Sequence, residues 1–126
     1  MNKYNVNVLI IEDNETLADV MVRVLKQFFT KKIEVLSLKD LSLNNVEFSK
    51  YDFLICNVNK RRNFNVLDTL ASIKASNKNL KTVITTETPS EQLEEKIFEI
   101  GVDKYLPKPY RLKDILTPLS KDNVAC

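Results

Sequence analysis

Four apolar runs of the chain end in residues whose side chains could bind a cation or a phosphoryl group. These ends carry Glu12-Asp13, Asn57, Thr86-Glu87 and Lys108-Pro109. Paired carboxylates are ligands for a hard divalent cation, and a hydroxyl and a lysine are groups that hold phosphoryl oxygens. If the four ends meet at one place, their combination indicates a site for a cation and a phosphoryl group.

Short β-rich runs alternate with longer helical stretches along the whole chain. The runs cover residues 6–11, 32–37, 53–57, 82–86 and 104–107. This alternation is typical of a parallel sheet covered by helices on both faces. Ligands of such sheets lie outside the carboxyl ends of the strands. The sequence therefore predicts a doubly wound α/β fold that gathers the four polar ends at one edge.

Apolar residues spaced by three and four predict the helices between these runs. The first helix carries an apolar stripe from Leu17 to Phe28 and should begin after Asn14, a favoured N-cap residue. Further helices are predicted around residues 66–73 and 93–100. Residues 38–51 mix periods, so only a short or irregular helix is expected there. The last helix, around residues 112–119, meets Pro118 and should be short or kinked.

The helix before Gly101 has the clearest boundary residues. Thr88 is the expected N-cap, Pro89 takes the first helical position and Glu91 closes a capping box. Gly101 is the single glycine of the chain and stands just past the predicted end.

Composition narrows the class of protein. The chain has 126 residues, 44% of them hydrophobic, a formal charge of +2 and no histidine. We expect one domain over residues 1–120, with residues 121–126 as a C-terminal tail or the start of a linker that has been removed. No apolar run reaches the ~20 residues that cross a bilayer, and no secretory pattern opens the chain, so a soluble cytoplasmic protein without membrane contact is expected. The dispersed charge gives no reason to expect direct nucleic-acid binding. Cys56 and Cys126 are expected to be free thiols.

Several segments together resemble the receiver domains of two-component response regulators, particularly the CheY-like chemotaxis type. They are "VLIIEDN", "YDFLICN", "VITTE", the lone Gly101 and "DKYLPKPY". The resemblance implies a flavodoxin-like sheet of five parallel strands in the order 2-1-3-4-5 with five helices. It also implies a signalling domain whose aspartate takes a phosphoryl group from a partner histidine kinase.

The resemblance also assigns roles to the strand-end residues. The implied Mg²⁺ ligands are Glu12, Asp13, Asn57 and the backbone carbonyl of Asn59. The implied phosphoryl-handling residues are Asn57 at the phosphoacceptor position, Thr86 as the switch hydroxyl, Tyr105 as the switch aromatic and Lys108 as the pairing lysine. Plainer interpretations stay open: Glu12-Asp13 could favour a helix dipole, and Tyr105 could be a packed sheet residue.

Several positions depart from the family pattern. Asn57 has an amide where a phosphoacceptor needs an anionic oxygen, so no acyl phosphate is expected there. The lost charge also predicts weak or absent Mg²⁺ binding. Arg61 stands where the family usually has proline and could occupy the metal position, although a run such as "KRR" is more often a solvated loop. Glu87 stands where the family favours a small residue, and it would narrow the pocket and restore a negative charge. Asp52 lies too far along the strand, at roughly 16 Å, to act as a substitute acceptor.

These residues support a leading hypothesis and two alternatives. The leading hypothesis is a non-phosphorylatable pseudo-receiver that acts by contacts with a histidine kinase or another signalling protein, with no independent enzyme activity. The face implied for contacts has Lys96, Lys104, Tyr105 and Arg111 as exposed contributors. The first alternative is a Mg²⁺-dependent, aspartyl-phosphorylated receiver captured as an Asp→Asn variant at position 57. The second is a flavin or nucleotide domain, which is disfavoured because "IEDNET" is acidic and lacks glycine. The partner, the pathway and the oligomeric state stay open.

Overall fold

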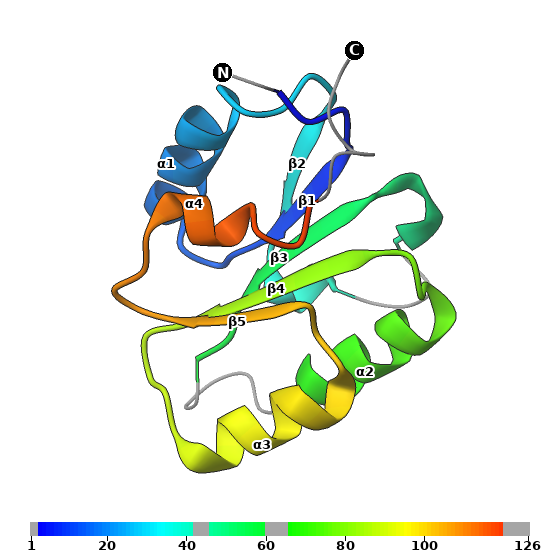
Figure 1. Cartoon of the computed structure of the whole chain (residues 1–126), viewed down its shortest axis with the longest axis vertical. Coiled ribbons are helices and arrows are strands. Elements are labelled where there is room, and N and C mark those ends of the chain that lie inside the picture. The colour runs from blue at the N-terminus through cyan, green and yellow to red at the C-terminus, as the bar shows by residue number, and fades with distance from the viewer. Residues whose placement is uncertain (1–2, 42–45, 60–65, 120–126) are drawn as a thin grey trace.

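The computed structural model describes residues 3–41, 46–59 and 66–119. Five parallel strands form one sheet in the order β2-β1-β3-β4-β5 (Figure 1). Their bounds are β1 Val8–Ile11, β2 Ile33–Leu36, β3 Phe53–Asn57, β4 Lys81–Thr86 and β5 Lys104–Pro107. The predicted fold class and strand order are confirmed.

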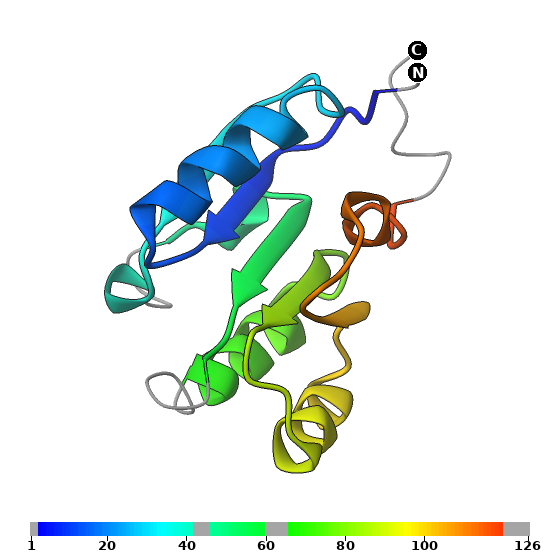
Figure 2. The same ribbon diagram turned by 90° about the vertical axis from the view of Figure 1, so that its left-hand side faces the viewer.

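Helices cover both faces of this sheet. Their bounds are α1 Glu15–Leu25, α2 Val66–Ser76, α3 Glu91–Ile100 and α4 Leu112–Ile115. Helices α1 and α4 lie on one face and α2 and α3 on the other (Figures 1 and 2). As expected, the last helix is short. No helix within the described residues is both long and apolar enough to cross a membrane.

The described part of the chain has four α-helices, where five were predicted. The connection from β2 to β3 instead contains two 3₁₀ turns, Leu38–Asp40 and Phe48–Lys50, and residues 42–45 between them lie outside the described part. The Ser37 hydroxyl donates to the Asp40 carboxylate over 2.7 Å. Local side-chain hydrogen bonds of this kind compete with the formation of a longer α-helix.

Alternating side chains of the strands build two hydrophobic cores. Leu54 and Cys56 face the core under α2 and α3, whereas Phe53 and Ile55 face the core under α1 and α4. All four are buried almost completely. Successive residues of a strand point to opposite faces of the sheet. The position of a polar residue at a strand end therefore decides which face its side chain points to.

Two polar side chains cap the first turns of α1 and α3, and a glycine ends α3. Asn14 caps α1 as predicted, since its Oδ1 accepts from the Leu17 N–H at 3.0 Å. The predicted capping box at Thr88 is wrong: α3 begins at Glu91, and the Ser90 hydroxyl accepts from the Leu93 N–H at 3.1 Å. Gly101 ends α3 with a φ of 80°, the left-handed conformation that favours glycine.

A partly buried ion pair joins α2 to the start of β5. The Asp103 carboxylate accepts from the Lys74 ammonium at 3.0 Å and from the Thr82 backbone N–H at 2.8 Å. Burial alone would raise the pKa of Asp103, but the Thr82 N–H and Lys74 together lower it. This pair fixes the strand that carries Tyr105 and leads to Lys108.

A second polar contact holds the far edge of the sheet. The Tyr51 hydroxyl donates to the Glu34 carboxylate at 2.5 Å. Burial is the main cause that raises the pKa of Tyr51 to about 12, and the hydrogen bond to the Glu34 carboxylate is the next.

Candidate functional site

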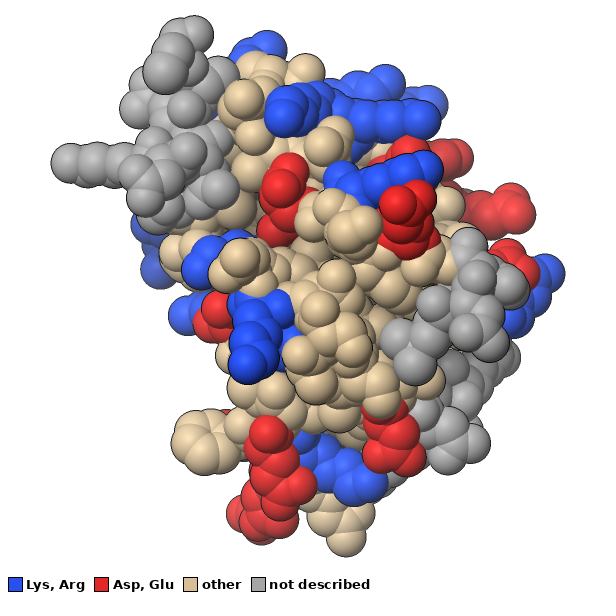
Figure 3. All heavy atoms as spheres, turned by 90° about the vertical axis from the view of Figure 1, so that its right-hand side faces the viewer, with Lys and Arg blue, Asp and Glu red and all other residues tan. Residues whose placement is uncertain are grey.

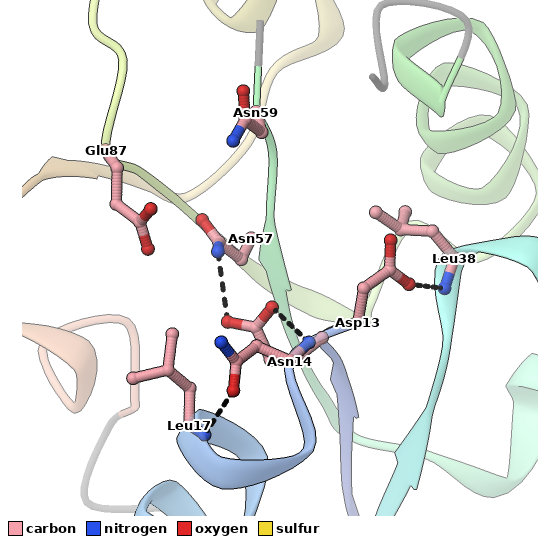
Figure 4. A pocket seen from close by; sticks show the side chains of 8 residues that line it. Asp13, Asn14, Leu17, Leu38, Asn57, Asn59 and Glu87 are labelled. Carbon is pink, nitrogen blue, oxygen red and sulfur yellow. Dashed lines mark hydrogen bonds between the residues drawn. The ribbon is translucent and has the colours of Figure 1, made fainter. Parts of the chain in front are cut away.

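A pocket of about 360 Å³ opens at the carboxyl ends of β1 and β3. Its lining residues are Glu12, Asp13, Asn14, Leu17, Leu38, Asn57, Asn59 and Glu87. The chain leaves β1 toward β2 on one side, while β3 lies on the other, so this is the point where the strand order reverses. Ligand sites of doubly wound sheets lie at such points. The structure thus brings most of the predicted strand-end residues together (Figure 4).

Glu12 is a buried carboxylate with two hydrogen-bond donors. Only 8% of the residue is exposed. One carboxylate oxygen, Oε2, accepts from the Asn14 backbone N–H at 3.2 Å, and the other, Oε1, accepts from the Asn57 side chain at 3.0 Å. A buried carboxylate oxygen without a hydrogen-bond partner is costly. Both of its oxygens are therefore engaged by groups of the chain itself.

Asn57 stands between a carboxylate and a hydroxyl. Its Nδ2 donates to Glu12 Oε1, and its Oδ1 accepts from the Thr85 hydroxyl at 3.4 Å. A carboxylate can only accept, so the contact with Glu12 fixes which end of the amide faces it. A dashed line from the labelled Asn57 marks the hydrogen bond to Glu12 in Figure 4.

Asp13 lies on the exposed side of the pocket. Its Oδ1 accepts from the Leu38 backbone N–H at 2.6 Å, which ties the β1 end to the 3₁₀ turn after β2. Asn59 lines the pocket beyond Asn57 (Figure 4). Among residues 3–41, 46–59 and 66–119, no group of three or more His, Cys, Asp or Glu side chains is arranged to hold a metal ion.

Lys108 and Glu87 form an ion pair at the rim. Lys108 Nζ lies 2.8 Å from Glu87 Oε1, and the two side chains are 31% and 43% exposed. Glu87 also lines the pocket, and Figure 4 shows its carboxylate directed toward Asn57. The peptide bond between Lys108 and Pro109 is cis.

Thr86 does not face the pocket. It is fully buried, and its hydroxyl accepts from the Thr88 backbone N–H at 3.1 Å. Its neighbour Thr85 lies directly opposite Asn57 in the sheet register and supplies the hydroxyl that contacts the amide. Thr85 was not predicted as a site residue. Strand alternation allows only one of two adjacent threonines to face Asn57, and the register of the sheet decides which one does.

The residues expected on the contact face differ in exposure. Lys96 and Arg111 are exposed, and Lys104 is partly buried. Tyr105 corrects the expectation of an exposed residue: it packs against the core under α2 and α3, and its hydroxyl is buried without a hydrogen-bond partner among the described residues. Burial, followed by the nearby Glu94 carboxylate, raises the pKa of Tyr105.

Three other residues of the sequence analysis lie away from the pocket or outside the described part. Arg61 falls in residues 60–65, which lie outside it. The Asp52 carboxylate accepts from the Asn7 backbone N–H at 2.8 Å, at the opposite end of β3. Cys56 is a buried free thiol, and burial raises its pKa. It is therefore no nucleophile for the site.

Sequence and structure comparisons identify relatives. Residues 8–120 match the family model of the response regulator receiver domain. An orphan response regulator of H. pylori is similar at 25% identity with a TM-score of 0.67, over 90% of this chain and 92% of that chain. A CheY-like receiver domain protein from Methanospirillum hungatei is 17% identical, with a TM-score of 0.71 over 90% and 89% of the two chains.

A third structure shows a relative in a phosphorylated state. It is a response regulator from Burkholderia pseudomallei solved with a phosphorylated aspartic acid and a calcium ion, at 23% identity and a TM-score of 0.69, over 93% of this chain and 68% of that chain. No functionally curated protein is detectably similar to the chain. The family match and the shared sheet show that this chain belongs to the response regulator receiver domains of two-component signalling.

Proposed function

We propose that this receiver domain signals through protein contacts without phosphorylation of residue 57. The observation that carries the proposal is the hydrogen bond from Asn57 Nδ2 to the buried Glu12 carboxylate. An acyl phosphate forms when a carboxylate oxygen attacks a phosphoryl donor. An amide has no such oxygen, and this one presents its nitrogen to the place where the acid pair of the family would hold a cation.

The donor set at the pocket also fits Mg²⁺ poorly. Receiver domains of this family commonly bind Mg²⁺, an ion that demands an octahedral set of oxygen ligands. Here both Glu12 oxygens accept from N–H groups of the chain, and Asp13 Oδ1 is bonded to Leu38. The Asn57 amide donates a hydrogen bond to the Glu12 oxygen that a cation would otherwise bind.

The ion pair between Glu87 and Lys108 supports the same proposal. By resemblance, Lys108 would pair with a phosphorylated carboxylate at residue 57. In this chain its ammonium lies 2.8 Å from the Glu87 carboxylate. Glu87 therefore supplies within the chain the anion that phosphorylation would otherwise bring.

Without a covalent switch, the control of this domain must come from binding. Receiver domains act with histidine kinases and other signalling proteins, and a partner of this kind is the expected ligand. A partner shifts a conformational equilibrium only by its differential affinity for the two states. The cytoplasmic location stays a prediction.

Intact-mass spectrometry tests the proposal. The parent chain, Asn57→Asp and the double variant Asn57→Asp/Glu87→Ala are each incubated with Mg²⁺ and a small acyl-phosphate donor. We expect no phosphoryl increment on the parent chain, and more on the double variant than on the single one because Lys108 is released. Phosphorylation of the parent chain at a specific residue would overturn the proposal. Rapid and complete labelling of Asn57→Asp alone would favour the alternative of a receiver captured as an Asp→Asn variant.

A further inference from the structure

The outer face of α3 carries one strongly exposed aromatic side chain. Phe98 is 87% exposed, well above the 52% and 44% of Val20 and Val35, the other exposed large hydrophobic residues of the described part. Leu93 and Ile97 anchor the same helix by packing into the core below it. The helix is thus held by other residues, and Phe98 contributes little to the fold.

Helix propensity gives no reason for a phenylalanine at this position. At an exposed helical site, straight-chain residues and alanine are favoured, because an aromatic side chain loses rotamer freedom against the preceding turn. A single exposed hydrophobic residue is common on protein surfaces. Phe98 differs from that case in its surroundings.

Four glutamates surround Phe98. They are Glu91, Glu94, Glu95 and Glu99, and together with Phe98 they line a surface hollow of about 450 Å³. No salt bridge between described residues involves any of the four. Acidic side chains, with basic ones between them, are visible at the end of the molecule that α3 forms (Figure 3). We call these five residues the Phe98 surface.

We propose that the Phe98 surface docks a basic amphipathic segment of a signalling partner, with Phe98 entering an apolar pocket between its lysines or arginines. This rests on the proposed function, because it names the chemistry of the partner through which the domain would act. Aromatic residues at the centre of an interface carry much of its binding energy, and complementary charges around them select the partner. The chain as a whole is slightly basic, with a formal charge of +2, so the negative charge of this surface is a local feature.

A second copy of the chain is the less favoured occupant. In a two-fold contact centred on Phe98, the same patch would face itself. The four glutamates of each copy would then approach those of the other, and like charges oppose such a contact. Charge complementarity therefore favours a different, basic partner.

An NMR titration tests this inference. The ¹⁵N-labelled full chain is titrated with a designed peptide of about 14 leucine and lysine residues, long enough for about four helical turns. The matched control peptide has glutamate in place of lysine. We expect saturable shifts on α3 with the lysine peptide only, and affinity that falls as salt is raised.

Variants of the chain separate the two parts of the surface. Phe98→Ala should weaken binding about tenfold or more, whereas Val35→Ala, an exposed hydrophobic residue on β2, should leave it unchanged. Glu95→Gln/Glu99→Gln should weaken binding and reduce its salt dependence, and Asp68→Asn on α2 should not.

Four results would overturn the inference: no saturable binding, shifts centred on the Glu12 pocket, equal binding by the glutamate peptide, or full affinity in Phe98→Ala. Concentration-dependent α3 shifts without any peptide would identify a second copy as the occupant and also overturn it. None of these readouts depends on residue 57, so intact mass still tests the proposed function separately.

Discussion

Replacing Asn57 by aspartate should destabilise the chain in the absence of a divalent cation. The new carboxylate would lie about where Nδ2 now stands, 3.0 Å from the buried Glu12 oxygen. At an effective dielectric near 20, two charges at this distance repel by about 5–6 kcal/mol. Protonation limits the cost: at pH 7, keeping a carboxyl of ordinary pKa protonated takes about 4 kcal/mol. Allowing for relaxation, we expect the unfolding free energy to fall by about 2–4 kcal/mol.

Urea unfolding at pH 7 in EDTA and then in Mg²⁺ measures this effect. Asn77→Asp is a matched control, because it also loses an Nδ2 hydrogen bond, here to the Ile73 carbonyl at 3.0 Å. The control should lose only about 1 kcal/mol and should not respond to Mg²⁺, whereas Mg²⁺ should restore much of the stability of Asn57→Asp. If Asn57→Asp in EDTA is as stable as the parent chain, the amide does not act as proposed.

Four further sites give simpler expectations. Tyr105→Phe should raise the free energy of unfolding by up to about 1 kcal/mol, because it removes a buried hydroxyl that has no hydrogen-bond partner among the described residues. Tyr51→Phe should lower it by about 1–2 kcal/mol, because it removes a hydrogen bond to the Glu34 carboxylate. Urea unfolding that ranks the two variants in the reverse order would contradict this. Asp103→Asn should be less stable than the parent chain at pH 7. Since the folded-state pKa of Asp103 is lowered, its contribution is present above its ordinary pKa and is lost as the pH falls through the lower, folded value. The free energies of unfolding of the parent chain and of Asp103→Asn should converge as the pH falls through this folded-state pKa. A difference between them that stays constant with pH would contradict this expectation. Gly101→Ala should cost about 1–2 kcal/mol from its left-handed backbone alone, since an added Cβ would meet no atom within 4 Å; a smaller loss in thermal unfolding would show that α3 can end differently.

Local signals made much of the fold predictable. The apolar run "FLICN" follows Asp52, ends in a polar residue and forms β3 over Phe53–Asn57 as expected. Asn14 and Gly101 were predicted correctly because an N-cap and a left-handed helix end depend on a few adjacent residues. The strand order came from the family resemblance, since periodicity alone does not order strands.

Features that depend on distant contacts could not be read in this way. Thr88 and Ser90 are both suitable caps, and the choice of Ser90 accompanies a bond from Thr88 to the Thr86 hydroxyl. The connection from β2 to β3 has no dominant period, and where a short or irregular helix was expected its described part has two 3₁₀ turns.

The site was predictable as a group of strand ends, but its pairing was not. The sequence placed Glu12 and Asn57 at one edge, whereas the bond between them depends on the orientation of two side chains. The pairing of Glu87 with Lys108 requires the geometry of two loops. Phe98 had a readable signal, because the spacing of Leu93 and Ile97 already places it off the buried face of α3.

Two-dimensional NMR with Mg²⁺ and beryllofluoride tests the central claim most directly. Beryllofluoride imitates a phosphoryl group only when a carboxylate oxygen and a cation hold it. We predict that the backbone resonances of Asn57, Thr86 and Lys108 in the parent chain do not move when both are added, and that Asn57→Asp shows a second set of peaks. A second set of peaks in the parent chain would show that its pocket still accepts a cation and a phosphoryl group, and would contradict signalling by contacts alone.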